Sequence, residues 1–166
     1  MQTNCLKFPK VALVLIGVAV SVAGCLKQEK FPVEPVIEYK SFEQFGDSAS
    51  MVFKFTDGDG DIGLDEGDTN SPFDTASTFY NNLFLEYFEL QEGVWTPVDL
   101  PIRYRIKRIT PTGQNKTLEG EIAIAMQGFP ASFALLDSGQ VRYSIQLVDR
   151  ALHLSNVVQT EAISVP

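Results

Sequence analysis

Apolar and polar residues alternate along most of the chain from about residue 35 onward. A period of two is typical of strands with one buried face, whereas helices repeat every 3.6 residues. The alternation is unbroken in Ile102–Lys107 and Val141–Leu147, and Met51–Phe55 places Met51, Phe53 and Phe55 on one face. We therefore expect strands in these three segments. Five further segments carry the same signal: Val36–Phe42, Leu83–Leu90, Val94–Val98, Glu121–Met126 and Thr160–Val165.

Turn-forming residues separate these segments, among them Gly46-Asp47, Glu92-Gly93 and Ser138-Gly139. Short strands at this spacing, without a convincing amphipathic helix between them, are typical of two packed antiparallel sheets. The sequence predicts an all-β fold, an immunoglobulin-like antiparallel β-sandwich of about seven to eight strands over residues 36–166. Phe129–Leu136 fits either a helical turn or a strand, and we leave it open.

The N-terminal segment has the pattern of a targeting signal and is set aside from the fold. Lys7 and Lys10 precede the apolar stretch Val11–Ala23, which is shorter than the roughly 20 apolar residues of a membrane-spanning helix. The stretch ends in Val22-Ala23-Gly24-Cys25, which resembles the lipobox of bacterial lipoproteins. The resemblance implies a signal peptide over residues 1–24, cleavage before Cys25, and a lipid anchor on Cys25 with acyl chains such as palmitate. The alternative is an uncleaved anchor helix with a chance cysteine.

Residues 25–35 join the lipidated cysteine to the predicted sandwich. Charged residues with Pro32 and Pro35 make this segment a short, semi-extended tether. No Asp follows Cys25 directly, whereas in enterobacterial lipoproteins an Asp at that place favours the inner membrane. By this analogy we expect the chain at the outer membrane, on a face that stays open.

The charge of the chain bears on its partners. The 166 residues carry a formal net charge of −8 at pH 7, with a pI near 4.6. An acidic surface repels phosphates, so nucleic acid is excluded as a partner. One histidine and two cysteines leave little material for nucleophilic or zinc chemistry, and cleavage before Cys25 leaves no second thiol for a disulfide.

Six carboxylates crowd into residues 57–68, where like charges repel unless a cation neutralises them. Calcium takes six to eight hard oxygen ligands, and the interleaved glycines permit tight curvature. Five residues match EF-hand positions 1, 3, 5, 9 and 12: Asp57, Asp59, Asp61, Asp65 and Asp68. However, Ile62 stands where an EF-hand needs glycine, and the flanks predict strands. The loop is therefore either a calcium loop between strands or a polar turn, and Asp149 and Asn156 add oxygens if their hairpin packs beside it.

Two motifs carry a family resemblance. Phe53–Leu64 runs from a strand into the acidic loop, and Val141–Asn156 runs from a strand into a D-x-A-x-x-x-S-N sequence. Together they resemble a group of small envelope lipoproteins of the Bacteroidetes with immunoglobulin-like domains. The resemblance covers most of residues 35–166 and implies the fold and the anchor, but no activity, because none is established for that group.

No catalytic constellation stands out in the sequence. Asp149, His153 and Ser155 sit in one short loop, whereas a catalytic triad converges from distant segments, so we expect no enzyme. We expect a non-catalytic envelope module for binding, assembly or adhesion, with the membrane and an unidentified envelope protein or glycan as partners. The alternative is an accessory glycan-binding lipoprotein of a polysaccharide uptake system, with a sugar platform drawn from Phe79, Tyr80, Tyr87, Phe88 and Trp95. A basic stripe, Arg103, Arg105, Lys107 and Arg108, is expected to pair with Glu86, Glu89 or Glu92 across a sheet.

Overall fold

The computed structural model describes residues 30–111, 116–129 and 139–165. The predicted signal peptide, Cys25 and most of the open segment Phe129–Leu136 lie outside these residues. The described part forms strands and one 3-10 turn, with no α-helix. The all-β prediction is therefore confirmed for it. The elements in chain order are β1 Val36–Phe45, β2 Ser48–Asp57, η1 Thr78–Tyr80, β3 Leu83–Gln91, β4 Val94–Tyr104, β5 Leu118–Gln127, β6 Gln140–Leu147, β7 Val158–Gln159 and β8 Ile163–Ser164.

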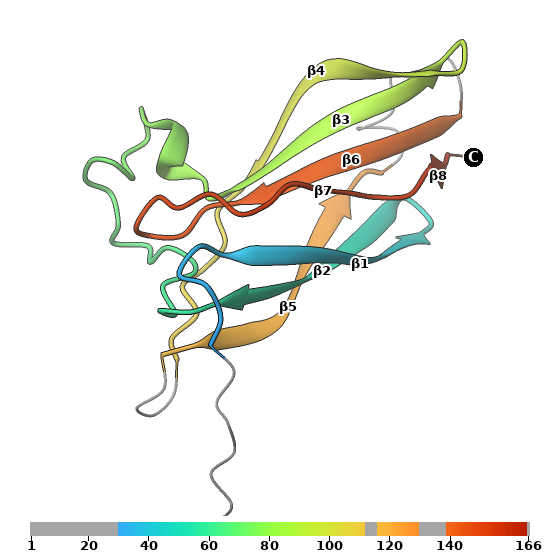
Figure 1. The fold of residues 1–166 in the computed structure, drawn as a ribbon. Helices are drawn as coiled ribbons and strands as arrows, with labels where there is room; N and C mark the ends of the chain where they lie inside the picture. The colour runs from blue at the N-terminus through green and yellow to red at the C-terminus, as the bar shows by residue number, and fades with distance from the viewer. Residues whose placement is uncertain (1–29, 112–115, 130–138, 166) are drawn as a thin grey trace, which may run out of the picture.

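The strands make two antiparallel sheets. One has three strands in the order β1-β2-β5, and the other has five in the order β4-β3-β6-β7, with β8 also pairing with β6. The two sheets form separate layers, with β1, β2 and β5 on one side and β3, β4 and β6 on the other (Figure 1). This arrangement is consistent with a β-sandwich.

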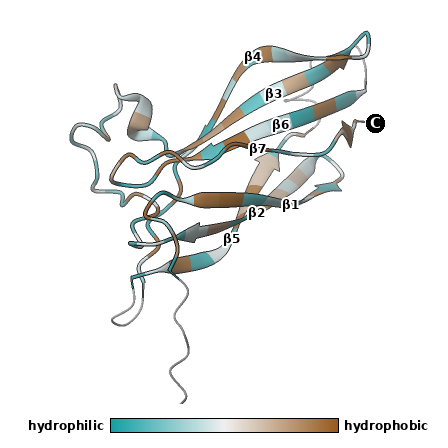
Figure 2. Cartoon of the chain, in the orientation of Figure 1, coloured by the Kyte–Doolittle hydropathy of each residue, from teal (hydrophilic) through white to brown (hydrophobic). Residues whose placement is uncertain are grey.

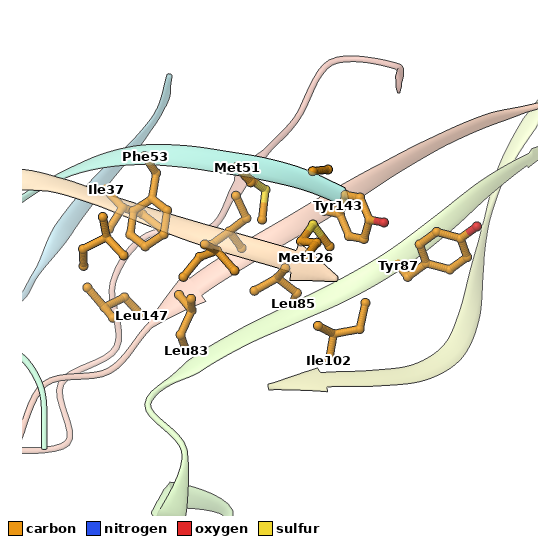
Figure 3. Packing of buried hydrophobic residues seen from close by; sticks show 14 of the residues in the cluster. Ile37, Met51, Phe53, Leu83, Leu85, Tyr87, Ile102, Met126, Tyr143 and Leu147 are labelled. Carbon is orange, nitrogen blue, oxygen red and sulfur yellow. The ribbon is translucent and has the colours of Figure 1, made fainter. Parts of the chain in front are cut away.

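The core lies between the layers and follows the alternation in the sequence, which appears as bands of opposite hydropathy along the strands (Figure 2). In β2 the predicted inward residues Met51, Phe53 and Phe55 are all buried. Tyr87 of β3 and Tyr143 of β6 pack with ring centroids 5.5 Å apart on the facing layer. Side chains from both sheets meet in the middle (Figure 3). Burying each large side chain contributes on the order of 1.5–3 kcal/mol to folding.

The boundaries of three predicted strands were wrong. The segments predicted at Val94–Val98 and Ile102–Lys107 form one strand, β4, which ends at Tyr104. Pairing with β3 continues past Pro97 and Pro101 because β4 is an edge strand, where a missing N–H costs no hydrogen bond. Thr160–Val165 is likewise not one strand, since its residues contribute only β8 and the short β7 ends before it.

Candidate metal site

The acidic loop begins where β2 ends. The inward positions of β2 are Met51, Phe53 and Phe55, and the same period of two turns Asp57 inward, with a fully buried side chain. A carboxylate at the last inward position of a strand is shielded from water but still lies close to the surface of the domain. The strand pattern itself therefore places the first acid of the loop.

Three of the five predicted ligands converge. Asp57, Asp59 and Asp61 each offer a carboxylate oxygen, and these oxygens lie within 4.8 Å of one another. Asp57 Oδ2 accepts a 2.8 Å hydrogen bond from the Asp61 backbone N–H. Asp57 Oδ1 and Asp61 Oδ1 are buried, and neither has a hydrogen-bond partner among the described residues. Buried polar atoms normally have partners, so these two oxygens make the group a candidate cation site.

The electrostatics of Asp57 and Asp61 agree with this interpretation. Burial raises the pKa of Asp57 to about 6, and the neighbouring charges of Asp59, Asp61 and Asp149 add to the rise. The pKa of Asp61 is raised as well, first by burial and then by Asp149 and Asp59. The group is thus short of positive charge, which a divalent cation would supply.

The other two predicted ligands, Asp65 and Asp68, do not join this group. Asp65 accepts a 2.8 Å ion-pair hydrogen bond from Arg108, and Asp68 is paired with Arg150. Arg105 donates to the backbone oxygens of both aspartates and to that of Tyr80. The pKa of Asp68 is lowered by a backbone hydrogen bond from Asp65 and by Arg150. The acidic loop is therefore divided into a cation-poor half and an arginine-paired half.

The basic stripe contributes to that second half. Lys107 lies 3.9 Å from Glu66, and Arg103 lies over the ring of Phe84. With Arg105 and Arg108, most of the stripe serves the acidic loop instead of pairing across the sheet as expected. The reason is that β4 ends at Tyr104, so the residues beyond it leave the sheet and run beside the loop, where Leu64 and Lys107 form a parallel bridge.

The connection after β6 supplies a further acid. Asp149 is buried and accepts hydrogen bonds from the His153 backbone N–H and pairs with His153 Nδ1, both at 2.8 Å. Its charge acts on Asp57 and Asp61, so the hairpin does pack beside the loop. Asn156 does not join the acidic loop. Its side-chain amide makes two hydrogen bonds to Ile37 of β1, accepting from the backbone N–H and donating to the backbone oxygen.

The aromatic residues considered for a sugar platform are dispersed. Tyr87 is buried in the core. Arg142 lies over the rings of both Phe88 and Trp95, at 5.5 and 4.6 Å from the centroids, and Arg105 lies over Tyr80 at 4.8 Å. These guanidinium groups occupy ring faces that a stacked sugar needs.

Comparison with known proteins adds no family. A scan against protein-family models and searches of curated proteins and of solved structures return no significant match to the chain. Fold and site together define the class: an all-β protein of two antiparallel sheets with a cluster of three carboxylates, one of them fully buried, at one end. Within the described ranges, no helix has the length and apolar character needed to cross a membrane.

His153 is the single histidine of the chain and therefore a clean reporter of this end of the domain. The hydrogen bond and the charge of Asp149 raise its pKa above the ordinary 6.5. We expect an NMR titration of the His153 ring to give a midpoint above 6.5 and Asp149→Asn to lower it. Glu34→Gln, which removes a weaker charge, should lower it much less. A midpoint at or below 6.5 in the unaltered chain would contradict the Asp149–His153 pair.

Proposed function

We propose that this chain is a lipid-anchored, non-catalytic module of a bacterial cell envelope, held at the outer membrane through Cys25. Its task is binding or assembly with another envelope component, in the manner of an accessory subunit or an adhesion module. Its domain is an immunoglobulin-like sandwich, and its acidic loop carries a structural calcium ion on Asp57, Asp59 and Asp61.

The observation that carries this proposal is the polarity of the domain. The tether leads into β1 at one end of the sheets, while the β1–β2 and β3–β4 turns lie at the opposite end (Figure 1). Those turns present two exposed apolar residues, Phe45 at 58% and Val94 at 65% exposure. The other large apolar residues that are exposed in the described part, Val33, Val36, Leu154 and Val157, belong to the tether, the start of β1 and the connection after β6. The support for a partner is therefore the position of the two turns, which lie at the end of the sheets away from the tether and are free to contact an envelope component (Figure 1).

The strand order supports the immunoglobulin-like part of the proposal. If β1, β2, β3, β5 and β6 are strands A, B, C, E and F, the sheets read A-B-E and C′-C-F, with β7 and β8 in the place of G. Immunoglobulin-type sandwiches divide their strands between the sheets in a similar way.

The alternative, an accessory glycan-binding lipoprotein, requires exposed aromatic rings with free faces. The arginines that lie over Phe88, Trp95 and Tyr80 weaken it. These arginine–ring contacts therefore favour binding or assembly over sugar stacking.

Lipid attachment is the direct test. In bacteria producing the full chain, tritiated palmitate should label the protein, and the label should be found in the membrane fraction. Cys25→Ser should lose both the label and the membrane association. Cys5→Ser is the matched control, because Cys5 lies within the predicted signal peptide and should leave both unchanged. Label retained by Cys25→Ser would refute the anchor.

A further inference from the structure

The tether and the acidic loop touch at Gly58. The Gly58 backbone N–H donates a 2.7 Å hydrogen bond to the Pro32 oxygen. A Cβ at Gly58 would lie 2.5 Å from the backbone oxygens of Phe31 and Pro32, so only glycine permits this approach. Gly58 stands between Asp57 and Asp59. The residue that receives the tether is therefore flanked on both sides by members of the carboxylate cluster.

We propose that a calcium ion on Asp57, Asp59 and Asp61 fastens the tether to the end of the sandwich, so that calcium fixes the domain against its membrane anchor. The inference rests on the proposed lipid anchor and calcium site, and it assigns to the ion a role in holding the tether against the domain.

The choice of a hard divalent cation follows from the donor set, which consists of carboxylate oxygens alone. Asp57 is fully buried, contributes a carboxylate oxygen to the cluster, and keeps its Oδ1 without a hydrogen-bond partner among the described residues, which an ordinary surface turn does not require. Opposite ligands lie about 4.6–5.2 Å apart around calcium and only about 4.0–4.2 Å apart around magnesium. The three oxygens lie within 4.8 Å of one another, inside the span of a calcium coordination sphere.

The coupling to the tether follows from chain continuity. Residues 57–61 form a tight loop that the Asp61 N–H to Asp57 hydrogen bond closes. An ion that draws the three carboxylates together also fixes the peptide unit of Gly58, which is the donor to Pro32. Without the ion, repulsion among the acids loosens this loop and with it the contact. From Cys25 to Phe31 the chain spans at most about 20 Å, so a fixed contact at Pro32 restricts how the domain sits over the membrane.

The test measures calcium binding and tether protection separately on the purified full chain in detergent micelles. Isothermal titration with calcium chloride reports binding. Hydrogen exchange at the Gly58 amide and cleavage by trypsin after Lys30 report the contact. With calcium, relative to EDTA, we expect both the exchange and the cleavage to slow by about tenfold or more.

Three variants separate the two parts. Asp59→Asn should lose calcium binding and the protection together. Asp47→Asn, the same change at an exposed position of the β1–β2 turn, should keep both. Gly58→Ala keeps all three carboxylates but collides with Phe31 and Pro32, so it should bind calcium while cleavage after Lys30 stays fast.

The outcomes are distinguishable. Calcium binding without any change in Gly58 exchange and Lys30 cleavage would overturn the coupling and leave the calcium site standing. Absence of calcium binding would overturn both, whereas the palmitate label on Cys25 decides the anchor independently. Calcium protection that persists in Gly58→Ala would also overturn the coupling, because the contact it needs is gone.

Discussion

In about 10 mM calcium the full chain is expected to unfold about 5–11 °C above its unfolding temperature in EDTA. The expectation assumes a Kd of about 10⁻⁴ M, as in extracellular calcium modules. A ligand at 100 times its Kd that binds only the folded state adds about 2.7 kcal/mol to the free energy of unfolding. The ion would also satisfy the two buried oxygens of Asp57 and Asp61 that have no hydrogen-bond partner among the described residues.

Two matched substitutions identify the ligands. Asp59→Asn should abolish the calcium shift, and in EDTA it should be neutral or slightly stabilising because it removes a charge beside Asp57 and Asp61. Asp65→Asn should keep the calcium shift, because Asp65 is paired with Arg108 and stands outside the cluster. Differential scanning calorimetry of the three proteins, with magnesium as a second ion, measures both effects. A shift lost equally in Asp65→Asn would restore the five-ligand interpretation of the sequence in place of the three-ligand one.

The features that could be predicted from the sequence are those that depend on the alternation of apolar and polar residues along the strands. Alternation located the main strands, and extending it by one step from Phe55 would also have shown that Asp57 is buried. Sequence reasoning did not take that step, although the signal was present. The unity of β4 was harder to foresee, because Pro97 and Pro101 interrupt the pattern. They are tolerated because β4 lies at a sheet edge and because Pro101 falls in the register shift between β3 and β4.

The division of the acidic loop could not be predicted from the loop itself. Nothing in the local sequence distinguishes the six carboxylates from one another. The arginines that form ion pairs with Asp65 and Asp68 lie 43 and 82 residues further along the chain. Which acids remain without a cation depends on where β4 ends and on how the connection after β6 returns. Such pairings follow from the tertiary structure and leave no local pattern.

The asparagine contacts at the sheet ends had no local signal either, and one of them yields the second large effect. Asn82→Ala is expected to lower the free energy of unfolding by about 2–3 kcal/mol. The Asn82 side chain is buried just before β3. Its Oδ1 accepts from the Ile106 N–H at 2.6 Å, and its Nδ2 donates to the Ile106 oxygen at 3.3 Å. The Asn82 side chain thereby provides Ile106, which lies beyond the end of β4, with backbone hydrogen bonds like those that a neighbouring strand would make.

Asn156 provides the matched comparison, because its amide makes the same two bonds to the backbone of Ile37, at 2.8 and 2.9 Å, from an exposed position. Alanine at residue 82 removes the partner of the Ile106 N–H at a buried position, where water enters poorly, while the Ile106 oxygen still accepts from the Leu64 N–H at 2.9 Å. Water can replace the Asn156 amide at its exposed position. We therefore expect Asn156→Ala to cost only about 1 kcal/mol. Urea unfolding of both variants, compared at unchanged m-value, measures the difference. Equal losses would mean that burial does not decide the strength of these contacts and that both asparagines act only by joining the ends of the sheets.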